Sequence, residues 1–155
     1  MSQQYWLMKS EPEECSIDDA LAARDATVPW TGVRNYQARN FMRDGMKIGD
    51  GVLFYHSSCA EPGIVGVARV ASATRPDPTQ FDAKSPYFDA ASKPEDPRWL
   101  LLDVQALRKT RVLALPELRS IPALADMVVL RKGNRLSITP VEAAHWKVIT
   151  GKLLA

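Results

Sequence analysis

Short runs of β-forming residues, separated by helical segments at irregular intervals, constrain the fold of this chain more than any other feature. Each run is rich in aromatic, β-branched or other apolar residues and ends at polar or turn residues, which is typical of strands. Strands are predicted at 5–8, 52–56, 64–70 and 99–104, and Gly66 inside the third run indicates a bulge or a close backbone approach. No regular strand–helix–strand rhythm is present, so a mixed α+β fold with a curled, partly closed sheet is favoured over a doubly wound one.

Capping signals place the helices between these strands. The sequence Ser-Ile-Asp-Asp at 16–19 has the form of a capping box and predicts a helix that continues to residue 25. Asn35 is a candidate N-cap for a second helix that reaches about residue 45. The sequence Thr-Pro-Val-Glu at 139–142 combines a capping box with proline at the first helical position, so we expect a third helix over 139–151.

Proline interrupts the rest of the chain. Residues 75–98 contain Pro76, Pro78, Pro86, Pro94 and Pro97, a density that opposes regular structure and predicts a long loop. Pro116 and Pro122 likewise divide 115–124 into short helical turns. We see no internal repeat and no linker.

Length and composition favour one folded domain. The chain has 155 residues, of which 46% are hydrophobic and 25% charged, as in ordinary globular proteins. No apolar run approaches the roughly 20 residues that cross a bilayer, and the start of the chain lacks the features of a signal peptide. We therefore expect a single cytoplasmic domain over residues 1–155 that makes no membrane contact.

The cysteines and histidines predict neither a disulfide framework nor a metal site. Cys15 and Cys59 are too few for such a framework, which fits a reducing compartment. With His56 and His145 they could supply four ligands, but the paired spacings of a zinc site are missing apart from His56-x-x-Cys59. We expect no metal and no cofactor.

Catalytic motifs are absent from the sequence. It contains no Gly-x-Ser-x-Gly, no His-Glu-x-x-His, no Walker loop and no Rossmann glycine pattern. Cys59 and His56 could form a nucleophile pair, but two residues near a turn, with no third group to orient them, are more simply interpreted as structural. The sequence thus predicts a binding protein with no catalytic residues.

Positive side chains fall in two local groups, although the net charge is only +2. Because the field of the whole molecule is weak, an anionic partner has to be held by such groups. Part of the first group shares one face of the predicted second helix at i, i+4 and i+8, a stripe that is usually just a solvated face. The two groups are Arg34, Arg39, Arg43 and Lys47, and Arg131, Lys132 and Arg135.

Aromatic residues interleaved with polar ones strengthen the case for nucleic acid. Core packing is the default role of any single one, but together they have the composition of a pocket that stacks a planar ring and reads its edge. The aromatic residues are Trp6, Trp30, Tyr36 and Tyr55, and their polar neighbours are Lys9, Ser10, Asn35, His56 and Ser57.

Five sequence blocks follow one another along the chain: Tyr-Trp-Leu-Met-Lys-Ser-Glu-Pro at 5–12, Trp-x-Gly-Val-Arg-Asn-Tyr-Gln-Ala-Arg-Asn at 30–40, Gly49-Asp50 leading to Phe-Tyr-His-Ser at 54–57, Gly-Ile-Val-Gly at 63–66, and Arg-Leu-Ser-Ile-x-Pro at 135–140. Together, and in this order, they resemble the EVE domain family. Tyr-Phe-Asp at 87–89 and Arg98-Trp99 also look like the middle section of the family, whereas Cys59 and Ala60 depart from it. The likeness runs from residue 5 to about 149, which implies a stand-alone domain of bacterial type.

The resemblance implies a PUA-like fold, a curved β-barrel of about five or six strands flanked by short helices and similar to YTH domains. It also implies binding of a modified base, such as a modified cytosine, in DNA or RNA. Our hypothesis is that the base is flipped into a pocket walled by Trp30 and Tyr55, with Ser10 and Asn35 bonded to its edge. The ligand-binding candidates are Trp6, Lys9, Ser10, Trp30, Val33, Arg34, Asn35, Tyr36, Tyr55, His56 and Ser57. The candidates for the nucleic-acid backbone are Arg39, Arg43, Arg131, Lys132 and Arg135, and Lys9 and Arg34 are further phosphate contacts in this hypothesis.

Two alternatives stay open at this point. The chain could be an enzyme that acts on modified nucleotides with His56 as acid or base, or a sensor of a small anion or metabolite in the same pocket. The sequence does not define the modification, the kind of nucleic acid, its strandedness or the oligomeric state.

Overall fold

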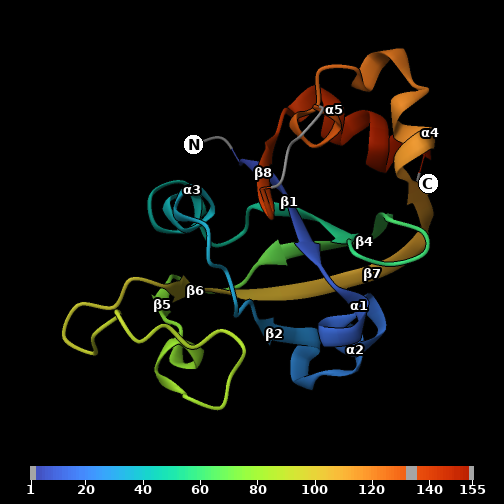
Figure 1. Cartoon of the computed structure of the whole chain (residues 1–155). Coiled ribbons are helices and arrows are strands. Elements are labelled where there is room, and N and C mark those ends of the chain that lie inside the picture. The colour runs from blue at the N-terminus through green and yellow to red at the C-terminus, as the bar shows by residue number, and fades with distance from the viewer. Residues whose placement is uncertain (1–2, 132–135, 154–155) are drawn as a thin grey trace.

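The fold is built on one six-stranded sheet with the strand order β2-β7-β4-β3-β1-β8 (Figure 1). The structure, a computed structural model, describes residues 3–131 and 136–153, and side chains up to residue 151. Strands β1 and β3 run parallel, while the other neighbours are antiparallel. The strands of this sheet are β1 Tyr5–Ser10, β2 Thr27–Pro29, β3 Gly51–His56, β4 Gly63–Val70, β7 Asp103–Ala114 and β8 Ile138–Val141. A separate two-stranded ladder joins β5 Arg75–Pro76 to β6 Leu100–Leu101.

The helices are short and several continue into irregular turns. The α-helices are α1 Pro12–Cys15, α2 Ile17–Ala22, α3 Tyr36–Asn40, α4 Leu115–Arg119 and α5 Ala143–Val148. Turns of π-helix follow α3 over Phe41–Gly45 and α5 over Ile149–Leu153. Turns of 3₁₀-helix cover Arg24–Ala26, Pro78–Phe81, Pro122–Leu124 and Val128–Leu130.

Two of the capping predictions are confirmed. Ser16 and Asp19 form the reciprocal capping box at the start of α2, and the Asn35 side chain accepts a hydrogen bond of 3.0 Å from the Ala38 N–H. The α-helix that Asn35 begins is shorter than predicted, because it changes to π geometry after Asn40.

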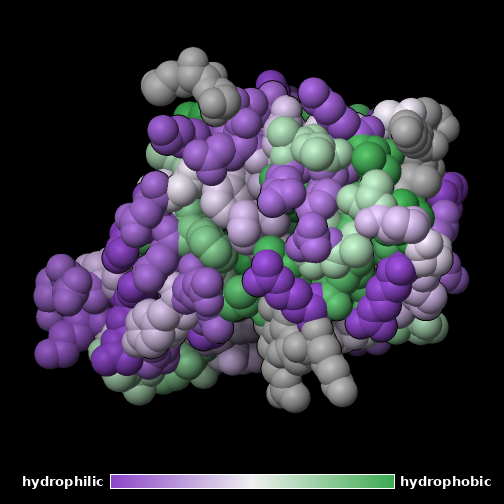
Figure 2. Space-filling model, turned by 90° about the horizontal axis from the view of Figure 1, so that it is seen from above, coloured by the Kyte–Doolittle hydropathy of each residue, from purple (hydrophilic) through white to green (hydrophobic). Residues whose placement is uncertain are grey.

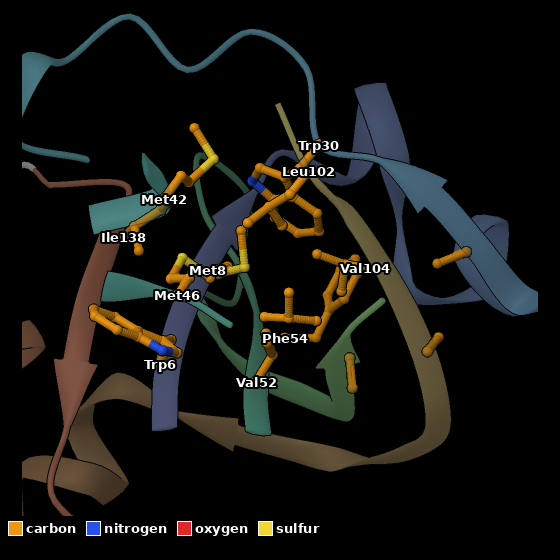
Figure 3. Packing of buried hydrophobic residues seen from close by; sticks show 14 of the residues in the cluster. Trp6, Met8, Trp30, Met42, Met46, Val52, Phe54, Leu102, Val104 and Ile138 are labelled. Carbon is orange, nitrogen blue, oxygen red and sulfur yellow. The ribbon is translucent and has the colours of Figure 1, made fainter. Parts of the chain in front are cut away.

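The sheet buries both of its faces. Along β1, Trp6 and Met8 belong to one apolar cluster and Leu7 to the other, since side chains alternate along a strand. The first cluster includes Phe54, and Figure 3 shows this side chain below Trp30 and Leu102. The second cluster lies beneath α4, α5 and the 3₁₀ turns at Pro122–Leu124 and Val128–Leu130, which Figure 1 places on the side of the sheet away from α2. The chain therefore has two cores, one on each side of the sheet.

The sheet is curved, but its two edges are not paired. The 12-residue strand β7 bends along its length and pairs with β4 throughout and with β2 only at Thr27–Pro29 (Figure 1). Within residues 3–131 and 136–153, no ladder connects the edge strands β2 and β8. Strand pairing thus supports a mixed α+β fold with a six-stranded sheet, and no closed barrel forms in the described residues.

Gly66 lies at an irregularity of the sheet, as predicted. The register between β3 and β4 shifts between Phe54 and Tyr55, so that Gly66 pairs with Phe54 and Ile64 with Tyr55. A Cβ atom on Gly66 would lie 2.5 Å from Cδ1 of Ile17 in α2 and 2.9 Å from the backbone oxygen of Arg108, so a side chain here would displace its neighbours.

The predicted helix over 139–151 is wrong in its first four residues. Residues 138–141 form β8 at the sheet edge, where Pro140 pairs with Trp6, and proline is tolerated on edge strands because its missing N–H faces away from the ladder. Helix α5 begins only at Ala143, and Glu142 is its N-cap without a side-chain bond. Gly151 lies inside the π turn and does not end the helix.

The other differences concern strands. The run at 99–104 is divided between β6 and the start of β7, which continues to Ala114, and the short β2 was not predicted. The proline-rich segment 75–98 is irregular, as expected, except for β5, one 3₁₀ turn and an isolated bridge between Lys93 and Asp96.

Polar residues cover most of the face in Figure 2, with apolar ones showing between them. In the described part of the chain, no helix combines the length and apolar character of a membrane span.

Candidate ligand-binding site

A cavity of about 460 Å³ opens where strands β1 and β3 end. Because these strands are parallel, with Ser10 paired to His56, the segments that follow both strands meet at the same edge of the sheet. Strand β2, the segment before α3, one residue of the proline-rich loop and the residue before β8 complete the wall. The lining residues are Lys9, Ser10, Glu11, Glu14, Cys15, Val28, Pro29, Trp30, Thr31, Gly32, Val33, Ser57, Ser58, Tyr87 and Ser137.

Trp30 forms part of the cavity wall and is held rigidly. Its backbone N–H donates to the Leu102 carbonyl at 2.9 Å, and its ring meets Phe54 edge-on with 5.2 Å between centroids. Only 7% of Trp30 is exposed, and Figure 3 shows its indole packed among the buried residues of the first cluster. The same residue lines the cavity.

Tyr87 is a second aromatic residue of the cavity, and sequence reasoning did not assign it to the site. Its ring lies against the backbone of Gly32, where a Cβ atom would be 2.8 Å from the ring carbons. Gly32 also has φ +83°, a conformation that glycine adopts without strain. The phenol donates to Oε1 of Glu14, and burial together with this carboxylate raises the pKa of Tyr87 to about 12. Tyr87 thus keeps its proton at neutral pH.

Several polar side chains of the cavity wall can accept hydrogen bonds, the Glu11 and Glu14 carboxylates among them. The Ser10 hydroxyl donates to the Cys15 carbonyl at 2.6 Å, so toward the cavity this oxygen can only accept. Within residues 3–131 and 136–151, Lys9 is the one cation that lines the cavity, and partial burial lowers its pKa from the ordinary value. Ser58 has φ +54°, a left-handed conformation that is uncommon for serine and often occurs at binding sites.

Arg34 is a structural residue, which contradicts the prediction that it contacts phosphate. It ties the segment before α3 to the proline-rich loop, and its side chain is 21% exposed beside a fully buried Asp77 carboxylate. All five of its N–H groups have protein partners: the Tyr87 carbonyl receives two, and the Val33 carbonyl, Asp77 and Thr79 receive one each. A phosphate could be bound only by breaking these bonds.

Tyr55 does not share a cavity with Trp30, so the predicted pair of aromatic walls is wrong. Trp30 belongs to the cluster on one side of the sheet and Tyr55 to the cluster on the other, and Tyr55 is 3% exposed. The reason is strand alternation: Tyr55 follows Phe54 in β3, so the two side chains point to opposite faces.

Trp6 also lies outside the cavity. It is 4% exposed, and its indole Nε1–H donates at 3.0 Å to Asp50, whose carboxylate accepts the Lys47 N–H as well. Trp6 therefore fixes the turn before β3 and packs in the core (Figure 3).

Three further candidates have structural partners near the cavity but do not line it. Asn35 caps α3, and His56 Nε2 accepts the Ile17 N–H at 3.0 Å, which consumes the lone pair that a general base would need. Desolvation lowers the pKa of His56. Tyr36 is 51% exposed and stacks on Trp99 with 4.8 Å between centroids.

The cationic candidates do not form one helical stripe. Arg39 lies in α3 over the Tyr36 ring, Arg43 lies in the π turn paired with Asp44, and Lys47 follows the helical segment. Arg131 is exposed, while Lys132 and Arg135 lie outside the described residues.

Of the predicted ligand-binding residues, Lys9, Ser10, Trp30, Val33 and Ser57 are brought together in the cavity. Their binding roles stay predictions. Sequence reasoning missed Glu14, Thr31, Ser58, Tyr87 and Ser137. The only available signal was that Tyr87 lies in a block resembling the EVE family, since neither spacing nor periodicity relates it to Trp30. In the part of the chain that the structure describes, no three potential metal ligands lie together.

The fold and the site define a class of protein: an α+β domain with a pocket at the ends of two parallel strands. The chain belongs to the EVE domain family, whose model matches residues 4–152. The chain is 43% identical to human thymocyte nuclear protein 1 over 155 residues, with 88% of this chain and 68% of that protein covered. The chicken protein of the same name is 44% identical, and the alignment covers 88% of this chain and 63% of that protein.

Solved structures agree with this assignment. A structure from Leishmania major has a TM-score of 0.91 and 43% identity, and covers 97% of this chain and 94% of that one. Human THYN1 protein in complex with 5-methylcytosine-containing DNA has a TM-score of 0.90 and 40% identity, with 96% of each chain covered. A protein from Zymomonas mobilis shares the fold at only 8% identity, with a TM-score of 0.54 and 97% and 99% of the two chains covered.

Proposed function

We propose that this protein binds DNA that carries a modified cytosine and receives the modified base in the cavity between Trp30 and Tyr87. The observation that carries the proposal is the cavity itself, about 460 Å³, with aromatic residues and a small set of polar groups in its wall. This volume is within the range of pockets that hold a small planar ligand. The human relative solved with 5-methylcytosine-containing DNA supports DNA as the partner.

The curvature of the six-stranded sheet supports a PUA-like architecture as the finer description of the fold. In this description β1 and β3 form the mouth, and their parallel ends expose backbone and hydroxyl groups to a base.

A role as a reader is favoured over catalysis. His56, the candidate acid or base of an enzyme, is engaged with the Ile17 N–H, and Cys15, the thiol of the cavity, has a raised pKa because of burial and the nearby Asp19 carboxylate. A thiol that stays protonated is a poor nucleophile. Mass spectrometry of modified oligonucleotides after incubation tests this point, because a reader returns its ligand unchanged.

The energetics favour an unpaired base. Stacking on an aromatic ring contributes about 1–3 kcal/mol, and extruding a paired base costs a few kcal/mol, so the two nearly cancel on intact duplex. A single methyl group adds roughly 1–3 kcal/mol, which limits preference for the methylated base to about tenfold to two-hundredfold.

The decisive experiment measures fluorescence anisotropy of labelled single strands that carry one central cytosine or 5-methylcytosine. Wild-type protein should prefer the methylated strand, and Trp30→Phe should weaken that preference about threefold or more because the smaller ring stacks less. Trp146→Phe is the matched control, since Trp146 stacks on Tyr5 with 4.5 Å between centroids and does not line the cavity. Equal preferences in wild type and Trp30→Phe would reject this pocket as the site.

A metabolite sensor is the other candidate function, because hydroxyl groups and one lysine could also hold a free nucleoside or anion. Competition separates the two: a sensor gains nothing from neighbouring phosphates, so free nucleoside would displace the labelled strand at equal concentration.

A further inference from the structure

The Glu14 carboxylate is an unusual group to find in the wall of a pocket for nucleic acid. It lines the cavity together with Glu11, and Lys9 is the one cation among the lining residues that the structure describes. Phosphate oxygens are repelled by carboxylates, so these groups do not favour the backbone of the ligand. A carboxylate accepts hydrogen bonds and donates none, so it favours a ligand that presents N–H groups.

Glu14 is also held in place. Its Oε1 accepts the hydroxyl of Tyr87, whose ring lies against Gly32. Tyr87 is in turn held by Arg34, which donates twice to its carbonyl, at 3.0 and 2.7 Å. Within residues 3–131 and 136–153, Oε2 of Glu14 has no hydrogen-bond partner, so one oriented acceptor remains available.

Ser10 supplies a second acceptor on the cavity wall. Its proton is committed to the Cys15 carbonyl at 2.6 Å, which leaves the lone pairs of its oxygen. Since Cys15 is the residue after Glu14 in α1, Ser10 and Glu14 are tied to the same short helix. Lys9, adjacent to Ser10 in β1, contributes donors only.

The acceptors of Glu14 and Ser10, together with the donors of Lys9, match one class of base edge. A cytosine-type or adenine-type edge carries an exocyclic amine, which donates, beside a ring nitrogen that accepts. A thymine-type edge presents a carbonyl oxygen in place of the amine, which would meet the carboxylate as two facing acceptors. Resting on the function proposed above, we propose that Glu14 accepts a hydrogen bond from the exocyclic amine of the bound base and thereby selects amino-bearing bases over their oxo-bearing counterparts.

The test compares 5-methylcytosine with thymine in the same labelled single strand. Both bases carry the same methyl group on the same ring. They differ only at the edge: 5-methylcytosine has an exocyclic amine beside an unprotonated ring nitrogen, whereas thymine has a carbonyl beside a protonated ring nitrogen. Hydrogen bonds to charged groups predict a wild-type preference for 5-methylcytosine of about tenfold to a hundredfold. Glu14→Gln should reduce this preference to within about threefold, because an amide can turn either its donor or its acceptor toward the ligand.

Two further variants make the result specific. Glu13→Gln removes the neighbouring charge from the same helix without touching the cavity wall, and should keep the wild-type preference. Tyr87→Phe keeps the ring but releases Glu14, and should lower the preference even if Glu14→Gln proves unstable.

Each outcome is decisive. If wild type binds both strands equally well, or if Glu14→Gln and Tyr87→Phe keep the full preference, the role of Glu14 is refuted while the proposed function stands. If wild type binds neither strand better than a strand with an abasic site, the proposed function fails, and the role of Glu14 fails with it.

Discussion

His56 links strand β3 to the helix that follows the cavity wall, and its protonation should weaken the fold. Its Nε2 accepts the Ile17 N–H, and desolvation holds its pKa below the ordinary value of 6.5, with Lys109 acting in the same direction and the Asp18 and Asp19 carboxylates opposing it. The unfolded chain therefore binds the proton more tightly than the folded one. The stabilising contribution is complete above about pH 6.5 and is lost as the pH falls through the lowered folded-state pKa.

Urea unfolding at pH 7.5, 6.0 and 5.0 measures this effect, and His56→Gln isolates it. Glutamine can accept the Ile17 N–H without titrating, so the difference in free energy of unfolding between wild type and variant should shift against wild type as the pH falls. A difference that is constant across the three pH values would contradict the assignment.

Arg34 should contribute to stability and not directly to nucleic-acid contacts. Arg34→Lys replaces five donors in a planar fork with three on a flexible chain, and leaves the buried Asp77 carboxylate poorly satisfied. We expect a loss of about 2–3 kcal/mol in the free energy of unfolding. Arg43→Lys is the control, since its pair with Asp44 is exposed and should change stability by less than about 1 kcal/mol. Similar losses in both variants, measured by urea unfolding, would contradict this role.

At the scale of elements, the proline-rich loop acts as a wall because it is fixed at both ends. Gln80 is fully buried, and its side-chain amide donates to the carbonyls of Asp77 and Trp99 while accepting from Ser92 and the Trp99 N–H. These bonds replace the backbone ladders that the prolines prevent. The loop can therefore present Tyr87 to the cavity in a defined position.

Gly32→Ala tests how this loop meets the segment before α3. The new Cβ would push the Tyr87 ring away and would be strained at φ +83°, so stability should fall by at least about 1 kcal/mol and affinity for the methylated strand should also fall. Gly49→Ala is a matched control, because Gly49 has φ +95° but nothing within 4 Å of the added atom. Both variants should lose stability in urea, but only Gly32→Ala should lose affinity; equal affinities would show that Tyr87 is not held there.

Local signals predicted some elements well and failed where long-range pairing decides the structure. The Ser16 capping box and the Asn35 cap depend on neighbours within one turn, so the sequence alone was sufficient. Residues 138–141 carry an equally good helix signal, but their pairing with β1 outweighs it. The length of β7 follows from its ladder with β4, which no pattern inside β7 reveals.

At the scale of the whole molecule, the sheet separates what the sequence places together. Trp30 and Tyr55 are both aromatic residues beside polar ones, but assigning them to one pocket requires knowing which face each occupies. They belong to different cores, whereas Trp30 and Tyr87, 57 positions apart, line the same cavity. Ser10 and Ser57 were predictable because Ser10 ends β1 and Ser57 follows β3, and the parallel pairing of these strands brings both ends to one edge of the sheet.

The charge of the whole molecule sets how strongly salt should affect binding. With 20 basic and 18 acidic residues the net charge is +2, so we expect few phosphate contacts and a shallow slope of log affinity against log salt.

Arg39 is a candidate for one of these phosphate contacts. Its guanidinium lies 4.9 Å from the Tyr36 ring centroid. Its bonds to Asn40 and the Arg98 carbonyl leave two N–H groups without partners among the described residues. Arg39→Ala should weaken binding to methylated and unmethylated strands alike and reduce the slope by about 0.7, the value for one lost contact on a single strand. Arg69→Ala is the control, because Arg69 pairs with Gly51 at the end of the sheet away from the cavity and should leave the slope unchanged. Anisotropy titrations between 50 and 200 mM salt measure these slopes. If Arg39→Ala, like Arg69→Ala, gave the same slope as wild type, the role of Arg39 would be contradicted.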